Sequence, residues 1–128
     1  MARHLRNRRG FTVIELMVVV AVIAILAAIA MPLYANVQSR VRITKARADL
    51  RTIASAVTTY QARLGSLPAT LDDLTITVAD TSGAAVGPFL AGVPAAPATW
   101  SYGSLYTVNA NGTFTLTATG DGTVITLP

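Results

Sequence analysis

The chain has 128 residues, of which 52% are hydrophobic and 12% are charged, and its formal net charge is +4. This composition is too apolar for a disordered protein, and the length allows one small domain with a membrane segment but not a second independent core. Four arginines precede Phe11 while the later basic and acidic residues balance, so the net charge does not by itself indicate nucleic-acid binding.

Residues 11–30 form an apolar run that only Thr12 and Glu15 interrupt. About 20 such residues cross a bilayer, and the arginines before them predict a cytoplasmic N-terminus. A plain single-pass anchor and a secretory signal peptide cleaved at Ala28-Ile29-Ala30 are two ordinary interpretations. Neither explains Glu15, because a carboxylate inside a span costs roughly 2.5–3.5 kcal/mol and is by default a functional-site hypothesis.

The sequence RRGFTVIEL, residues 8–16, resembles the class III signal of type IV pilins and pseudopilins. Those families have a short basic leader that ends in Gly, followed by Phe-Thr-x-x-Glu and an apolar helix. The resemblance implies that prepilin peptidase cleaves after Gly10 and that the new amino group of Phe11 is methylated. The similarity continues through Pro32 and Tyr34, where the family also tends to have Pro and an aromatic residue.

Cleavage after Gly10 suggests a partner for the acid in the span. It would leave a cationic amine on Phe11, about one helical turn from Glu15. Between staggered subunits, Glu15 of an incoming copy could meet Phe11 of a docked copy, and burial would strengthen this pair. We therefore predict an assembly role for Glu15, which is also the role that the resemblance implies.

The helical pattern continues beyond the span. Pro32 predicts a kink or a loosened turn near residues 28–31. Apolar residues then recur every three or four positions, which predicts an amphipathic helix that ends at Gly65 and packs on the C-terminal domain. These residues are Ile43, Ala46, Leu50, Ile53, Val57, Tyr60 and Leu64. The arginines on the other face are interpreted as solvated or as subunit contacts rather than as a DNA site.

The last half predicts a short capped turn, a loop and a β-meander. Thr70 and Asp73 could cap a turn at residues 71–74, and residues 75–97 are interpreted as an ordered loop. Asn111-Gly112 and Asp121-Gly122 are hairpin turn signals. They predict three strands with one apolar face and an opposite face rich in threonine. The apolar face consists of Tyr106, Val108, Phe114, Leu116, Ala118, Ile125 and Leu127.

Together these features predict an α+β fold in which a long N-terminal helix packs on a small antiparallel β-meander, as in type IV pilins. The expected parts are a leader (1–10), a transmembrane or filament-core helix (11–32), an amphipathic helix (33–65) and a loop-plus-β domain (66–128). The spacing of Gly65-x-x-Pro68, together with the sequence GPFL at residues 87–90, resembles the major pseudopilin of type II secretion. That subfamily usually binds calcium through several acids in a C-terminal loop, whereas residues 119–122 supply only Asp121. Calcium is therefore unsupported and no cofactor is predicted.

The sequence does not indicate an enzyme, because the only histidine is His4 and there is no cysteine. The predicted function is a structural subunit of a type IV pilus-like or pseudopilus filament. The alternative is a minor pilin that acts at a filament tip as an adhesin or DNA-capture module. The resemblance implies an inner-membrane precursor and a periplasmic or extracellular filament. Its implied partners are further copies of the chain, prepilin peptidase, an assembly ATPase and a platform protein.

Overall fold

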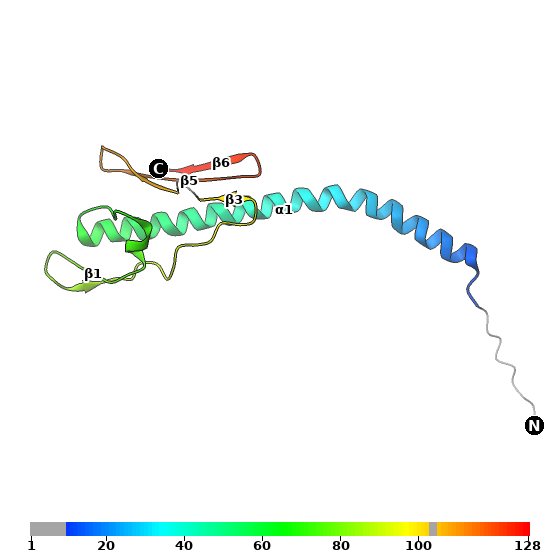
Figure 1. Cartoon of the computed structure of the whole chain (residues 1–128), viewed down its shortest axis with the longest axis horizontal. Helices are drawn as coiled ribbons and strands as arrows, with labels where there is room; N and C mark the ends of the chain where they lie inside the picture. Colours follow the sequence, from blue (N-terminus) through cyan, green and yellow to red (C-terminus); the bar gives the residue numbers. More distant parts are fainter. Residues whose placement is uncertain (1–9, 103–104) are drawn as a thin grey trace, which may run out of the picture. The chain divides into compact units, whose positions relative to one another are not determined.

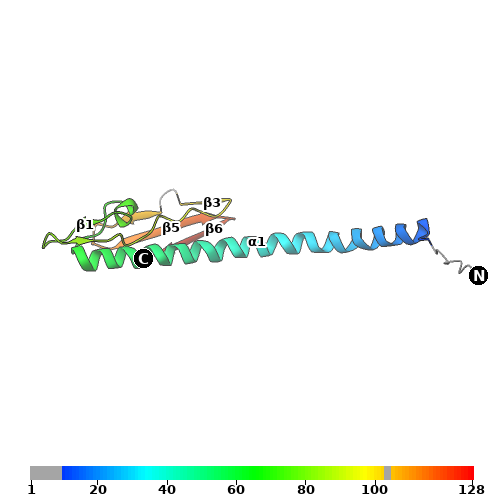
Figure 2. The ribbon, with the colours of Figure 1, turned by 90° about the horizontal axis from the view of Figure 1, so that it is seen from below.

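The computed structural model describes residues 10–102 and 105–128 (Figure 1). Within these ranges the elements in chain order are α1 (Val13–Leu64), η1 (Leu71–Leu74), β1 (Val78–Ala79), β2 (Ala85–Val86), β3 (Trp100–Ser101), β4 (Tyr106–Val108), β5 (Phe114–Gly120) and β6 (Thr123–Leu127). The chain divides into two compact units, Met1–Gln38 and Ser39–Pro128. In the second unit the C-terminal part of α1 packs on a small antiparallel sheet, which confirms the predicted α+β class (Figure 2).

The first unit consists, in its described part, of the start of α1 and the residues that precede it. Its apolar side chains are exposed along the whole segment from Phe11 to Val37. Pro32 lies inside α1, and the helix is assigned without a break through that position. The predicted kink at Pro32 therefore does not take the form of a break in the helix, and a bend there stays a prediction. The predicted leader lies outside the described residues, apart from Gly10.

The second unit is built on the predicted apolar stripe of α1. Five of its seven members are buried, and the two end members, Ile43 and Leu64, are half-buried against the same core. Spacings of three and four bring these side chains to one face because an α-helix has 3.6 residues per turn. The helix ends as predicted, since Gly65 has a φ of 76° and its N–H donates to the Gln61 carbonyl at 2.8 Å.

The sheet that covers this stripe has the predicted register. Leu116 pairs with Tyr106 on one side and with Leu127 on the other, and Ala118 pairs with Ile125. Leu116 and Ala118 are fully buried, while the threonines of the opposite face are more exposed. At the β5–β6 turn, Asp121 and Gly122 have φ values of 48° and 70°. Positive φ at both central residues is the requirement of a type I′ turn, so the predicted hairpin is confirmed.

The prediction of a three-stranded meander was incomplete, because β3 adds a fourth strand. Trp100 pairs with Gly120 and Ser101 pairs with Thr119. β3 and β6 both pair with residues 119–120, and β4 and β6 both pair with Leu116. A strand has only two edges, so β3 and β4 follow one another along one edge of β5 and β6 occupies the other.

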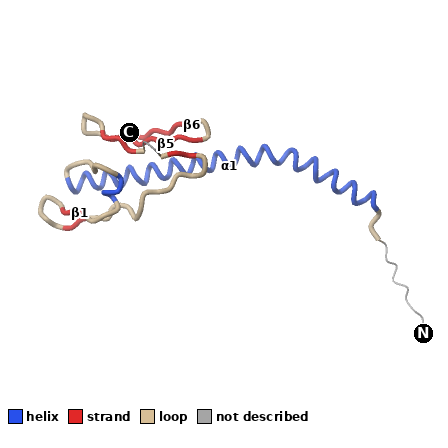
Figure 3. Tube along the Cα trace, viewed as in Figure 1, coloured by secondary structure: helices blue, strands red, loops and turns tan. Residues whose placement is uncertain are grey.

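The interpretation of residues 75–97 as a loop without regular structure was also partly wrong. β1 and β2 form a short antiparallel hairpin with Val78 opposite Val86 (Figure 3). Asp80 holds its turn, since its carboxylate accepts hydrogen bonds from the N–H groups of Ser82 (2.8 Å) and Ala84 (2.9 Å). The Ser82 hydroxyl also donates to Asp80 Oδ1 at 2.6 Å, and this bond, followed by the Ala84 bond, keeps the pKa of Asp80 below its usual value. Two-residue strands are too short to show the alternation that identifies a strand in a sequence.

The short turn before the hairpin formed where it was predicted, as a 3-10 helix. The Asp73 carboxylate accepts a hydrogen bond from the Thr70 N–H at 2.8 Å. Leu74 is fully buried, and its carbonyl accepts bonds from the N–H groups of Phe89 (2.8 Å) and Leu90 (2.9 Å). The Phe89 ring meets Tyr60 of α1 edge to face, with centroids 5.4 Å apart. These contacts attach the segment that follows β2, which includes Phe89 and Leu90, to the core.

Candidate functional site

The first candidate site is the start of α1, where the sequence predicts processing and assembly. Thr12 precedes the first helical residue, and its N–H and hydroxyl both donate to Glu15 Oε2 at 2.9 Å. The Glu15 N–H donates in return to Thr12 Oγ1 at 3.3 Å. This reciprocal arrangement is a capping box, which satisfies N–H groups that the first turn of a helix leaves without partners.

The capping box gives Glu15 a local role that the sequence interpretation missed. The signal that could have found it is the spacing of Thr12 and Glu15, which matches the capping-box pattern Thr-x-x-Glu. Both hydrogen bonds to this carboxylate end on Oε2, and Oε1 has no hydrogen-bond partner among the residues that the structure describes. An ionised carboxylate can accept about four hydrogen bonds, so the cap leaves Glu15 free to accept from a further donor.

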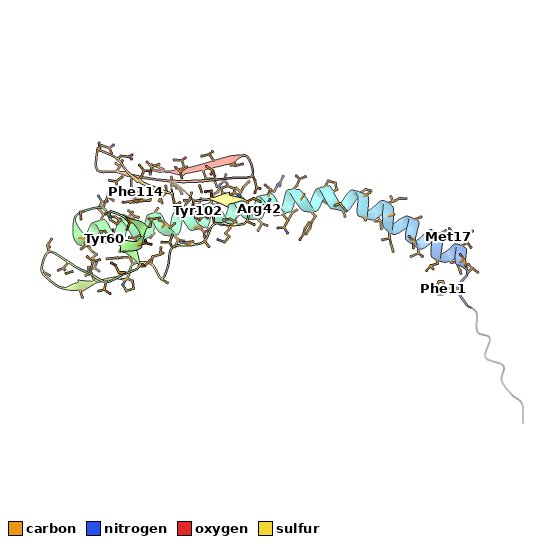
Figure 4. The ribbon with its side chains drawn as sticks, viewed as in Figure 1. Phe11, Met17, Arg42, Tyr60, Tyr102 and Phe114 are labelled. Atoms are coloured by element: carbon orange, nitrogen blue, oxygen red, sulfur yellow. The ribbon has the colours of Figure 1, made fainter. Side chains whose placement is uncertain are left out.

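The surface around this cap is strongly apolar. Phe11, labelled in Figure 4, is 88% exposed. With Ile14, Val18 and Val19 it lines a shallow hollow of about 370 Å³ beside Glu15. Within α1 an 18-residue window reaches a mean hydropathy of 3.0, and none of that window is buried by the described chain. By length and composition α1 is therefore able to cross a membrane, although a signal sequence would pass the same test.

The structure places the predicted site residues in one segment but leaves their chemistry untested. Gly10 and Phe11 lie just before Thr12, the residue that caps the helix, and both are exposed, as a cleavage and methylation site requires. A Cβ atom added to Gly10 would meet no other atom within 4 Å, so packing does not explain a glycine there.

A second polar site joins α1 to the β5–β6 turn. Arg42 Nε donates to Asp121 Oδ2 at 2.7 Å, and Arg42 Nη2 donates to Oδ1 at 3.1 Å. Trp100 Nε1 and Thr99 Oγ1 complete the ring of donors at 2.9 and 3.0 Å. We call these four residues the helix–sheet clamp. The bidentate contact with Arg42, followed by the Trp100 bond, lowers the pKa of Asp121 to about 2.

The prediction for Asp121 was correct about the backbone turn and missed the contact of its side chain. The turn was predicted correctly, but no pattern in the sequence indicates that the carboxylate binds Arg42, which lies 79 positions away. Calcium does not fit this position, because it requires six to eight oxygen ligands and the carboxylate already faces a guanidinium. Within residues 10–102 and 105–128, moreover, no three His, Cys, Asp or Glu side chains are placed to share a metal ion.

A third polar cluster fixes the loop before β3 to the same helix. Lys45 Nζ donates to Asp49 Oδ2 at 2.7 Å and to the Ala95 carbonyl at 3.0 Å. The Tyr102 hydroxyl donates to Asp49 Oδ2 at 2.8 Å. Burial, together with this carboxylate, raises the pKa of Tyr102 above its usual value. These groups satisfy one another, so the cluster is a structural contact rather than a reactive site.

Comparisons with known proteins bear on both halves of the chain. Residues 5–31 match the family described as "Prokaryotic N-terminal methylation motif". Residues 34–124 match the family described as "Type II secretion system (T2SS), protein G". No solved structure matches the chain.

Individual relatives include both pseudopilins and pilins. The type II secretion system core protein G of Pseudomonas aeruginosa is 35% identical over 78 residues, which are 61% of this chain and 55% of that protein. A type IV major pilin, PilE1 of Neisseria gonorrhoeae, is 41% identical over 61 residues (48% of this chain and 37% of the pilin). A fimbrial protein of P. aeruginosa is 44% identical over 52 residues (41% and 34%). The chain thus spans between about a third and somewhat over half of these relatives.

Proposed function

Because the chain belongs to the type II secretion system protein G family, we propose that it is a structural subunit of a pseudopilus or type IV pilus-like filament. The proposal rests on one combination, namely an N-terminal methylation motif at residues 5–31 followed by a protein G region at residues 34–124. The family consists of structural proteins and not enzymes, so no catalytic residue is assigned.

The proposed pathway begins in the inner membrane. The precursor inserts through its apolar N-terminal segment, prepilin peptidase cleaves after Gly10, and the amino group of Phe11 is methylated. An ATPase and a platform protein then move subunits from the membrane into a helical filament. Exchange of lipid for neighbouring helices is favourable because every large apolar side chain from Phe11 to Val37 is exposed in the single chain.

The mature N-terminus tests this pathway directly. Removal of ten residues from 128 leaves a product of 118 residues. Mass spectrometry of the protein from cells should find methylated Phe11 as the first residue, and a Gly10→Val variant should keep its full length. A first residue at Met31 would contradict the proposal, because a secretory signal peptidase would then have removed the apolar segment.

We propose further that Glu15 recruits subunits by pairing with the Phe11 amine of a neighbouring copy. Oε1 of Glu15 supports this role, because it has no partner among the described residues and the intrachain cap uses only Oε2. An amine and a carboxylate that meet in an apolar environment stabilise each other, and loss of one leaves the other charge buried without a partner.

Three substitutions separate the capping role of Glu15 from its charge. Glutamine at the third helical position still completes a capping box, but it has no negative charge. If charge pairing drives assembly, Glu15→Gln and Glu15→Ala should both abolish filaments, while Thr12→Ala, which weakens the cap, should retain them. Normal assembly of Glu15→Gln together with failure of Glu15→Ala would show that only the cap matters.

The abundance of the chain in purified filaments distinguishes a major subunit from a tip-located adhesin or DNA-capture module. The match over residues 34–124 favours the major pseudopilin. We therefore expect the chain to be the dominant component of sheared filaments. Its presence only in trace amounts would favour the tip subunit.

A further inference from the structure

The charges of the second unit do not all find partners within the chain. Arg42 pairs with Asp121, and Lys45 pairs with Asp49. The basic residues without an ion-pair partner in the described part of the chain are Arg40, Arg47, Arg51 and Arg63. All four lie on α1, and the first three are spaced by seven and four residues, so they share one face of the helix.

Two of these arginines border a groove beside the outer strand of the sheet. Arg47 and Arg51, with Val124 and the rest of the groove wall from β6, enclose about 320 Å³. Val124 is 65% exposed, and β6 has no strand of the described residues on its outer edge. We call this surface the basic groove. It combines two free cations with an apolar side chain and an open strand edge, which are features of a surface that binds another protein.

A groove with an exposed acid lies beside β4. It has a volume of about 450 Å³, and its wall includes Asp72, Leu71, Val93 and Tyr106. The carboxylate of Asp72 is exposed and has no partner among the described residues, whereas those of Asp73 and Asp80 accept local hydrogen bonds. We call this surface the acidic groove. It therefore offers one free anion next to an apolar wall.

The two grooves lie beside opposite edges of the sheet. The basic groove is at β6 and the acidic groove is at β4, and these strands pair with opposite edges of β5 at Leu116. Two different surfaces placed in this way cannot close a symmetric dimer with each other. Contact between unlike surfaces repeats from copy to copy and produces a closed ring or, where the rotation between copies does not close, an open helical array of the kind that a filament requires.

From this arrangement we infer that the basic groove of one copy receives the Asp72 side of the acidic groove of a second copy. Opposite charge and apolar walls on both surfaces make the two grooves complementary. The inference rests on the proposed filament function and adds the contact between the globular domains. The same arginines would also suit the phosphates of DNA, but their apolar surroundings and the matching acid favour a second copy.

Charge reversal tests this contact in filaments formed by the full chain. Asp72→Arg would place a third cation against the two arginines, and Arg47→Asp with Arg51→Asp would leave Asp72 facing anions. We expect each of these variants to lower the filament yield by about tenfold, because like charges repel across an interface. A variant that carries all three reversals should recover the wild-type yield to within about threefold.

Arg63→Asp is the matched control, since Arg63 is also exposed and has no ion-pair partner among the described residues, but it does not border the groove. It lies about a third of a turn around the helix from Arg51 and should assemble normally. Thermal unfolding of each variant separates loss of assembly from loss of folding.

The outcomes distinguish this inference from the function on which it rests. Normal filaments from Asp72→Arg, or failure of the triple reversal to recover, would overturn the inference while the filament function stands. So would duplex-DNA binding by wild-type filaments that is lost in the Arg47→Asp, Arg51→Asp variant without any change in yield. A wild-type chain that forms no filaments would remove the proposed function, and the inference with it.

Discussion

The two parts of α1 differ in what covers their apolar side chains. In the second unit Leu50 and Ile53 are fully buried, whereas in the first unit Leu26 is 61% exposed and Ile29 is 66% exposed. The part of α1 in the second unit has one apolar stripe, and one small sheet is enough to cover it. In the first unit, residues 13–31 are apolar around nearly the whole helix, apart from Glu15. No single sheet can cover a surface that surrounds the helix. A helix that is apolar on all sides is stable only when lipid or other helices surround it.

The largest expected effect is a difference in unfolding free energy between the same substitution, leucine to alanine, made in each of the two parts of α1. Leu50→Ala should destabilise the second unit by about 2–5 kcal/mol, because it leaves a cavity among side chains that are fully packed. Leu26→Ala should leave this transition unchanged, since Leu26 contributes nothing to that core. The fluorescence of Trp100, the only tryptophan, can report unfolding of the full chain in detergent. Equal destabilisation by the two variants would contradict the division into a covered and an uncovered part.

A smaller effect on the unfolding free energy is expected at Gly120 of β5, which contacts the Trp100 ring of β3. A Cβ atom at Gly120 would overlap the indole ring of Trp100, so Gly120→Ala should cost about 1–3 kcal/mol. Gly92→Ala is the control, because a Cβ there meets no atom within 4 Å. It should change the unfolding free energy by less than about 0.5 kcal/mol. Denaturant titration measures both, and a neutral Gly120→Ala would show that Trp100 does not pack on β5 as described.

The smallest effect concerns the helix–sheet clamp and depends on pH. The pKa of Asp121 is about 2 in the folded chain and 3.8 in the absence of the clamp. Since the folded-state pKa is lowered, the clamp contributes fully above about pH 4 and its contribution is lost as the pH falls towards 2. Asp121→Asn keeps a residue that tolerates the turn but removes the charge.

The test is the difference in unfolding free energy between wild type and Asp121→Asn across this pH range. The difference should be present at pH 6 and nearly absent at pH 2. A difference for Asp121→Asn that does not vary with pH would contradict the ionic character of the clamp.

Periodic features of the fold could be predicted from the sequence. The stripe from Ile43 to Leu64 has a spacing that only a helix can gather on one face. The pairing of Leu116 with Leu127 followed from the two-residue turn at Asp121-Gly122, because a fixed loop length sets the register. The N-terminal motif is similarly local. In each case the pattern lies within a short stretch of residues, so one amino-acid sequence is enough to recognise it.

Features that depend on distant residues could not be predicted. β3 has two residues, and its pairing with Gly120 depends on a loop whose path no local pattern fixes. The bond between Arg42 and Asp121 joins residues 79 positions apart. Charged side chains have no periodic signal that identifies a partner across such a distance. The capping role of Glu15 is an exception, because its pattern is local and was overlooked in favour of the signal motif that contains it.

In an assembled filament, other copies of the chain should cover the apolar segment of the first unit. The absence of natural cysteine allows single reporters at Val18, in the apolar hollow, and at Thr81, on an exposed turn of the second unit. The measurement is the labelling of Val18→Cys and Thr81→Cys by a water-soluble maleimide in sheared filaments. We predict rapid labelling of Thr81→Cys and protection of Val18→Cys that denaturing detergent removes. Equal labelling of the two thiols in intact filaments would contradict the account.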